Sequence, residues 1–369
     1  MEDELPVTTV VSLAGFLAGM VFGAVANRTN FCTMGAISDV VFMGDYRRMR
    51  AWMLSILIAI IGTQGLHVAG VIDIYSSIYL TPNFGWFGNI LGGLLFGFGM
   101  SLAGGCGNKT LVRIGGGSLK SIIVFLIMGV VAYMTMRGLT GLLRVDIQDL
   151  TNINLGESGV PSQGIVDILA VATGADNLSI RWLVVALFAG GLSFYCFKDK
   201  SFRASQMHIL SGLIIGALIT AGWWITGVLG YDDFDPVRLT SFTFVAPVGE
   251  SIQYLMIFTG ATINFGIAAV GGVIFGSFLA ALVTKTFKIE AFADSNDLLR
   301  HMGGAVLMGF GGVTAMGCTI GQGITGMSTL STGSLITLVS IIVGGIYGMK
   351  YLEEGSFIDA LKAMLTRTS

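Results

Sequence analysis

The stretch GFGMSLAGGC at residues 97–106 recurs as GFGGVTAMGC at residues 309–318. The two copies keep one register, because their first glycines (309 − 97 = 212) and their cysteines (318 − 106 = 212) are equally far apart. Each copy places a glycine-rich turn and a thiol inside apolar sequence, where a membrane protein ordinarily runs as an unbroken helix. The pair predicts a duplicated membrane protein whose helices break at the two cysteines.

The composition is that of an integral membrane protein. Hydrophobic residues make up 53% of the chain and charged residues 11%, whereas a soluble domain carries about 25% charge. Nine segments approach the ~20 apolar residues that a crossing helix needs, and the alternating strands of a membrane barrel are absent. We expect an all-α fold with spans near 10–26, 50–72, 87–104, 119–138, 181–197, 207–229, 265–284, 302–317 and 333–350.

Several apolar segments are too short or too glycine-rich to cross a bilayer alone. They cover residues 30–42, 107–115, 319–327 and 252–264. Such irregular backbone is tolerated at membrane depth only when it is buried in protein or lines a cavity. We therefore interpret these segments as half-helices or re-entrant arms.

The distribution of basic residues predicts the orientation of the chain. Basic connections at 45–50, 113–120, 198–203 and 285–300 alternate with acidic or neutral connections at 73–85, 140–180 and 230–250. The positive-inside rule then places the N-terminus outside and the C-terminus in the cytoplasm. The helix before Cys106 would run inward and the helix before Cys318 outward, as in an inverted repeat with its site at the midplane.

This orientation divides a single transmembrane domain, residues 1–369, into three parts. The N-terminal repeat covers residues 1–138 and the C-terminal repeat covers residues 181–369. Residues 139–180 form a polar excursion between them, which we expect to lie outside the membrane with short helices. The later GSL triplets at 117–119 and 333–335 are 216 residues apart (333 − 117 = 216), so the second repeat carries four extra residues.

A third cysteine, Cys32, follows a helix in which Gly15, Gly19 and Gly23 recur every fourth residue. Small residues at this spacing let helix backbones approach closely. The expected counterpart helix carries Gly212 and Gly216 but no following cysteine. Cys196 ends an ordinary span, and we expect it only to pack, as buried cysteines commonly do.

Helices that begin at mid-membrane direct free N–H groups and a positive dipole end toward the break. Opposed breaks of this kind can hold an anion without a buried basic side chain. Neutral thiols add weak S–H donors, and we expect apolar surroundings to keep them protonated. The pattern predicts a path for a small soft anion along Cys32, Cys106 and Cys318.

Polar and small residues beside these cysteines are candidate binding neighbours: Asn30, Gly105, Gly107, Asn108, Lys109, Thr110, Gly317, Thr319 and Gln322. They either bind the solute or satisfy backbone groups freed at the turns. Lys109 and Arg113 share a helix face and serve either anion attraction at the inner mouth or membrane topology. We expect Asp39 to pair with Arg47 or Arg48.

Three blocks resemble the YeeE/YedE family of sulphur-transport membrane proteins: NRTNFCTMGAISD at 27–39, GGLLFGFGMSLAGGCGNKTLVR at 92–113 and LRHMGGAVLMGFGGVTAMGCTIGQG at 299–323. The resemblance implies a nine-span, hourglass-shaped inner-membrane protein that takes up thiosulfate past three cysteines, here Cys32, Cys106 and Cys318. Departures occur at Lys109, Thr110, Met316 and Ser38, and changes of this kind could alter the sulphur or selenium species carried.

The leading hypothesis is a non-enzymatic permease for a small inorganic sulphur anion, thiosulfate first, in a bacterial-type inner membrane. The alternatives are a permease for another sulphur or selenium species, a membrane thiol oxidoreductase or sulphurtransferase, and a scaffold assembled through its glycine faces. Besides the bilayer, a cytosolic sulphur-accepting protein is a compatible partner, and nothing indicates nucleic acid.

We expect no cofactor and no metal. No CxxC pair occurs, and the three histidines, His67, His208 and His301, are scattered along the chain, which supports neither a zinc site nor a pair of haem ligands. Residues 115–120 lack the spacing of a nucleotide-binding loop.

Overall fold

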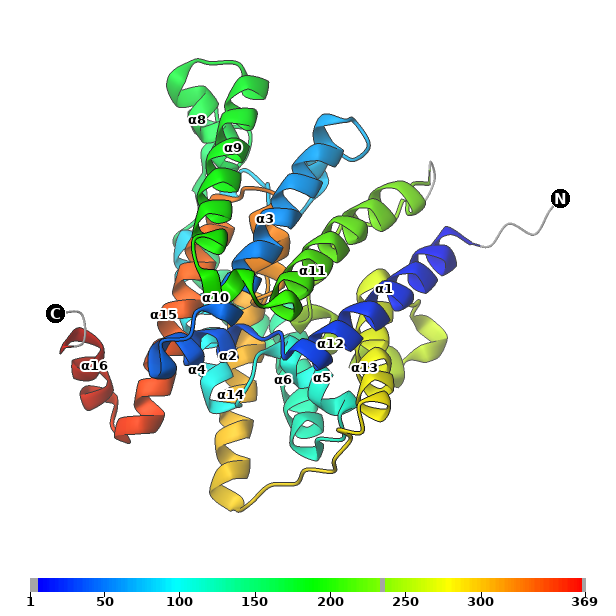
Figure 1. The fold of residues 1–369 in the computed structure, drawn as a ribbon. Coiled ribbons are helices and arrows are strands. Elements are labelled where there is room, and N and C mark those ends of the chain that lie inside the picture. Colours follow the sequence, from blue (N-terminus) through cyan, green and yellow to red (C-terminus); the bar gives the residue numbers. More distant parts are fainter. Residues whose placement is uncertain (1–5, 233–235, 367–369) are drawn as a thin grey trace.

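The computed structural model describes residues 6–232 and 236–366, so the acidic first residues and both chain ends lie outside the described part. The described chain is helical apart from one two-stranded pairing, β1 (Asn83–Phe84) with β2 (Ile153–Asn154), and short connections. An all-α membrane fold is thereby confirmed. Figure 1 shows α8 (Ile165–Thr173) and the start of α9 (Asn177–Phe197) projecting at one end of the molecule.

Eight described segments are long and apolar enough to cross a membrane. Five of these segments are single helices: α3 (Arg47–Val68), α6 (Leu119–Arg137), α9, α13 (Phe265–Val283) and α15 (Thr332–Glu354). Two others are broken helices: α1 (Val7–Thr29) with α2 (Thr33–Ser38) and η1 (Asp39–Met43), and α4 (Trp86–Leu102) with α5 (Gly107–Gly115). In the last, α11 (Gln206–Trp224) continues directly into the π-helical turn η4 (Ile225–Leu229).

The remaining expected span, residues 302–317, corresponds to α14 (Ser295–Thr314), which is 20 residues long but begins with the polar run SNDLLRH. In this first turn, Lys120 Nζ lies 2.7 Å from Asp297 Oδ2. At the other end, Gln148 of α7 (Leu139–Asp149) donates to the Thr314 carbonyl at 3.3 Å. The helix therefore runs from the basic connections to the polar excursion.

Three of the four expected half-helices are confirmed in place. They are α2 with η1, α5, and the π-helical turn η6 (Gly321–Gly326). The fourth was placed wrongly, because the helix α12 covers Val245–Met256 rather than residues 252–264. Pro247 lies in the first turn of α12, where proline is favourable, and Asn264 caps the next helix by accepting from the Ile267 amide at 2.9 Å.

Glycines bring the long helices into close backbone contact. A Cβ on Gly19 of α1 would lie 2.6 Å from the Ala269 carbonyl oxygen of α13, and a Cβ on Gly212 of α11 would lie 2.6 Å from the Ala51 carbonyl oxygen of α3. The helices that the sequence paired as counterparts, α1 and α11, thus each pack their glycine face on a different long helix. Figure 1 shows α1 beside α11 across the middle of the molecule.

The two copies of the glycine motif pack against each other. Gly92 of α4 faces Gly311 of α14, with 2.7 Å between the Cβ position of each and the carbonyl oxygen of the other. Gly99 likewise faces Gly304. In the repeat, Gly304 is the counterpart of Gly92 (304 − 92 = 212) and Gly311 is the counterpart of Gly99 (311 − 99 = 212). Gly92 thus contacts the counterpart of Gly99, and Gly99 contacts the counterpart of Gly92, so α4 and α14 run antiparallel. This reciprocity agrees with the predicted inverted repeat, which itself stays a prediction.

Candidate functional site

All three cysteines follow the same kind of helix-ending turn. Two residues before each cysteine the backbone is left-handed, at Asn30 (φ 51°), Gly104 (φ 67°) and Met316 (φ 57°). The next amide then reaches five residues back, with Gly105 N donating to the Met100 carbonyl at 2.9 Å and Gly317 N to the Gly312 carbonyl at 2.7 Å. This is the Schellman arrangement, which satisfies the last carbonyls of a helix.

Cys32 and Cys106 directly precede the short helices α2 and α5, and Cys318 lies three residues before η6. The Gly35 amide donates to Cys32 Sγ at 3.5 Å, and the Gly321 amide donates to Cys318 Sγ at 3.4 Å. Cys106 holds the position before α5. The sulphur atoms therefore lie where the first amides of a helix are free and its dipole is positive.

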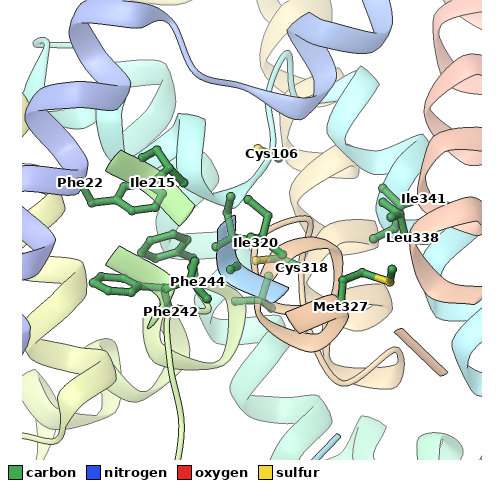
Figure 2. Close-up of a cluster of buried hydrophobic side chains, with 14 of the residues drawn as sticks. Phe22, Cys106, Ile215, Phe242, Phe244, Cys318, Ile320, Met327, Leu338 and Ile341 are labelled. Atoms are coloured by element: carbon green, nitrogen blue, oxygen red, sulfur yellow. The ribbon is translucent and has the colours of Figure 1, made fainter. Parts of the chain in front are cut away.

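The fold brings the three breaks together in one buried cluster. Cys106 and Cys318 are fully buried, Cys32 is 4% exposed, and all are free thiols. The Cys32 thiol is close enough to interact with the Cys106 thiol, and the Thr319 hydroxyl approaches Cys106. Figure 2 shows Cys106 and Cys318 in this cluster, beside Ile320, Met327 and the rings of Phe242 and Phe244.

Among the described residues, a buried polar atom without a hydrogen-bond partner occurs one or two positions after each of the three cysteines. These atoms are Thr33 Oγ1, Asn108 Oδ1 and Thr319 Oγ1. Buried polar groups normally have partners, and leaving one unpaired costs about 1–3 kcal/mol. Their coincidence with the thiols is what a path that receives a polar solute requires.

The other candidate neighbours have structural partners. The Thr110 hydroxyl donates to the Cys106 carbonyl at 3.1 Å. Gln322 donates to the Ala315 carbonyl at 2.6 Å and accepts from the Ser334 hydroxyl at 2.5 Å, which braces the turn around Cys318. Gly105 lies under the stem of Lys109, Gly107 opens α5, and a Cβ on Gly317 would lie 3.0 Å from the Gln322 amide.

A cavity of 390 Å³ is lined by Asn30 and Lys109, which lie two residues before Cys32 and three residues after Cys106. Its charged lining is mostly basic: Arg28, Lys109, Arg113 and Lys288, with the single carboxylate of Glu290 among the described residues. Lys109 Nζ donates to Asn30 Oδ1 at 3.0 Å and so joins the turn before Cys32 to the helix after Cys106. This arrangement can attract an anion at the side where the basic connections lie.

Sequence reasoning missed one residue of the cluster, Phe244. It precedes α12 as Cys32 precedes α2, and the register could have located it, since 244 − 32 = 212. Its ring packs edge-on against Phe22 at 5.3 Å between centroids and is fully buried. The fourth break therefore supplies an apolar wall where the other three supply a thiol.

Two expectations outside the cluster are met, and one stays open. Cys196 lies in a separate apolar group, where its thiol donates to the Arg50 carbonyl at 3.4 Å. Asp39 pairs with Arg48, at 2.9 Å between Nε and Oδ2. Within the described residues, no three His, Cys, Asp or Glu side chains come together as a metal ion would need, and the absence of a cofactor remains an expectation.

Comparison with known proteins places these features in a family. Residues 28–347 match the family described as sulphur transport. The thiosulfate transporter TsuA of Escherichia coli (strain K12) is 28% identical over 90% of this chain and 92% of its own length. The thiosulfate transporter TsuA of Spirochaeta thermophila is 26% identical over 89% of this chain and 96% of its own length.

A shorter match is to the probable transporter YedE of Escherichia coli (strain K12), 31% identical over 26% of this chain and 22% of that protein. The family match, by contrast, covers all three cysteine blocks and both copies of the glycine motif. The chain therefore belongs to the sulphur transport family.

Proposed function

We propose that this chain carries a small sulphur-containing anion, thiosulfate first, across a bacterial-type inner membrane along Cys32, Cys106 and Cys318. The observation that carries the proposal is the convergence of three helix breaks, each with a cysteine, on one buried cluster. Two relatives named as thiosulfate transporters, similar along most of the chain, support the choice of substrate.

The site binds the anion through helix dipoles, and the positive charge of the basic cavity then draws the anion out of the site. Free amides and positive helix ends at the breaks stabilise a dianion, while neutral thiols and unpaired hydroxyls add weak donors. No Lys or Arg ammonium or guanidinium is needed between the thiols, so the anion is held loosely. Beyond the Cys32–Cys106 pair it meets the basic cavity, where Lys109 and Arg113 draw it toward the cytoplasm.

The proposal includes the inverted repeat and the orientation with the N-terminus outside and the C-terminus in the cytoplasm. The reciprocal glycine contacts between α4 and α14 support the repeat. Passage is then from Cys318 toward Cys106 and Cys32. A cytosolic protein that accepts the sulphur anion at the basic cavity is a compatible further partner.

The test is uptake in cells that lack their own sulphate and thiosulfate importers. We expect the chain to restore growth on thiosulfate, and Cys106→Ala or Cys318→Ala to reduce uptake of radiolabelled thiosulfate by about tenfold or more, as loss of one or two donors to an anion predicts. Cys196→Ala is the matched control, since that thiol lies outside the cluster. Failure of the unmodified chain to take up any inorganic sulphur species refutes the proposal.

The nearness of the Cys32 and Cys106 thiols also favours a second candidate, a membrane thiol oxidoreductase or sulphurtransferase. Such chemistry passes through a disulfide or persulfide at this pair. Mass spectrometry of protein recovered during turnover distinguishes the two, because a permease leaves both thiols unmodified while thiosulfate accumulates unchanged.

A further inference from the structure

A second polar site lies at the N-terminus of α15, on the side of the excursion. Within the described residues, the amides of Gly333 and Ser334 have no hydrogen-bond acceptor, whereas the Thr332 amide donates to the Gln163 carbonyl at 3.0 Å. Ser331 precedes the helix without a side-chain capping bond. A 23-residue helix thus presents free amides and its positive end to this point.

Two buried side chains, Asn89 and Gln163, approach this helix start, and a third, Thr337, belongs to the helix itself. Among the residues that the structure describes, Asn89 Nδ2, Gln163 Oε1 and Thr337 Oγ1 have no hydrogen-bond partner, and each residue is at most 1% exposed. A Cβ on Gly333 would lie 2.7 Å from Asn89 Nδ2 and 2.6 Å from Gln163 Oε1, so both amide groups turn toward that glycine. Thr337 lies one turn further along the same helix face.

The donors at this point suit a small oxyanion. The free amides, the Asn89 amide nitrogen and the Thr337 hydroxyl can all donate. Gln163 can present its nitrogen as well, since that group makes only a 3.5 Å contact with Thr81 Oγ1. Four or five neutral donors at a positive helix end make an anion site of the kind that needs no basic side chain.

We propose that Asn89, Gln163, Gly333 and Thr337 form an outer waiting site, which binds the oxyanion before it reaches Cys318. The inference rests on the proposed function and adds a site to it. Ser334, the next residue, donates to Gln322, and the Gln322 amide donates to the Cys318 carbonyl at 2.8 Å. Through Ser334 and Gln322, the start of α15 is therefore linked to the backbone of Cys318.

The same site assigns a role to the excursion. The Gln163 amide donates to the Thr81 carbonyl at 3.1 Å, and the Ile165 amide donates to the Leu330 carbonyl at 2.9 Å. Residues 163–165 thus cover the site and tie it both to the connection before α4 and to the start of α15. The excursion acts as its lid.

The test is uptake of radiolabelled thiosulfate into proteoliposomes that contain the full chain. Gly333→Ala places a Cβ 2.7 Å or less from both amide groups and so displaces them. Asn89→Asp keeps the shape of the side chain while adding a charge that repels an anion. For both we expect the half-saturating concentration to rise about tenfold with the maximal rate retained, as the loss of one charge-assisted hydrogen bond predicts. Gly303→Ala is the matched control, because a Cβ there meets nothing within 4 Å.

Unchanged half-saturation in Asn89→Asp and in folded Gly333→Ala, with the unmodified chain active, overturns the waiting site alone. No uptake by the unmodified chain overturns the proposed function instead. Binding of radiolabelled thiosulfate to purified Cys318→Ala separates the two further: we expect binding to persist in that variant and to be lost when Asn89→Asp is added. Binding that survives Asn89→Asp also counts against the site.

Discussion

At the scale of single residues, the glycines of the repeated motif act through the space that they leave. A Cβ on Gly97 would collide with the Ile341 carbonyl and lie 2.7 Å from the Gly345 amide, both backbone groups of α15. We expect Gly97→Ala to lower the free energy of unfolding by about 1–3 kcal/mol, as overpacking does. Thermal unfolding in detergent measures this.

The control for Gly97→Ala is Gly65→Ala in α3, where a Cβ meets nothing within 4 Å. Alanine favours a helix over glycine by about 1 kcal/mol, so this variant should unfold at the same temperature or above. Equal unfolding temperatures for the two variants would show that the close contact of α4 with α15 does not limit stability.

The 212-residue spacing of the repeat predicted which residues of the site are equivalent in the two halves, but not which of them are in contact. It identified Cys106 and Cys318 as counterparts, and their turns indeed share a left-handed residue, Gly104 or Met316. The contact between Cys32 and Cys106 depends on how α1 packs beside α5, which no local pattern contains. The unpaired Asn89 and Gln163 were missed for the same reason, since their meeting point is set by three distant segments.

At the scale of elements, one ion pair holds the corner between α2 and α3. Asp39 is 6% exposed and binds Arg48, whose guanidinium lies over Gly35 in the turn after Cys32. We expect Arg48→Met to destabilise the protein by about 3–5 kcal/mol, because it leaves a buried carboxylate unpaired. Size-exclusion profiles and thermal unfolding in detergent measure the loss.

The double variant Asp39→Asn, Arg48→Met tests the reason for that loss. Removing both charges should recover most of the stability, since an uncharged pair of similar shape has no unpaired ion. Arg47→Met is the control, because that side chain pairs with Asp45 on the surface, where an ion pair contributes at most about 1 kcal/mol. A double variant as unstable as Arg48→Met would assign the defect to lost packing.

Hydropathy predicted most helices because each is a continuous apolar segment long enough to cross a membrane. It failed at α12, where the helix begins at Val245 although the apolar run was placed later. The capping residues, Pro247 in the first turn and Asn264 at the next helix, carry the local signal for these ends. For α14 the opposite holds: packing against α4 and α6 keeps a helix whose first turns are polar.

At the scale of the whole molecule, the basic segments between helices contact one another, and so do the acidic or neutral segments. Arg50 pairs with Asp199, and the Leu119 amide donates to the Glu290 carbonyl at 2.8 Å, so the four basic connections contact in two pairs. On the other side, β1 pairs with β2 in the polar excursion, and Gly164 bridges to Ser331. Two faces that differ in charge fit the orientation predicted from the sequence.

The number of crossings decides between two arrangements of the chain, because nine place the ends on opposite sides and eight place them on one side. The difference is the segment between residues 292 and 330, which contains α14 and η6. We expect alkaline phosphatase, active only outside the cytoplasm, to be inactive when fused after residue 292 and active after residue 330. The controls flank α9, with fusions active after residue 174 and inactive after residue 200. Equal activity at 292 and 330, with both controls as expected, would leave eight crossings and remove the opposed helix ends on which anion binding at Cys106 and Cys318 depends.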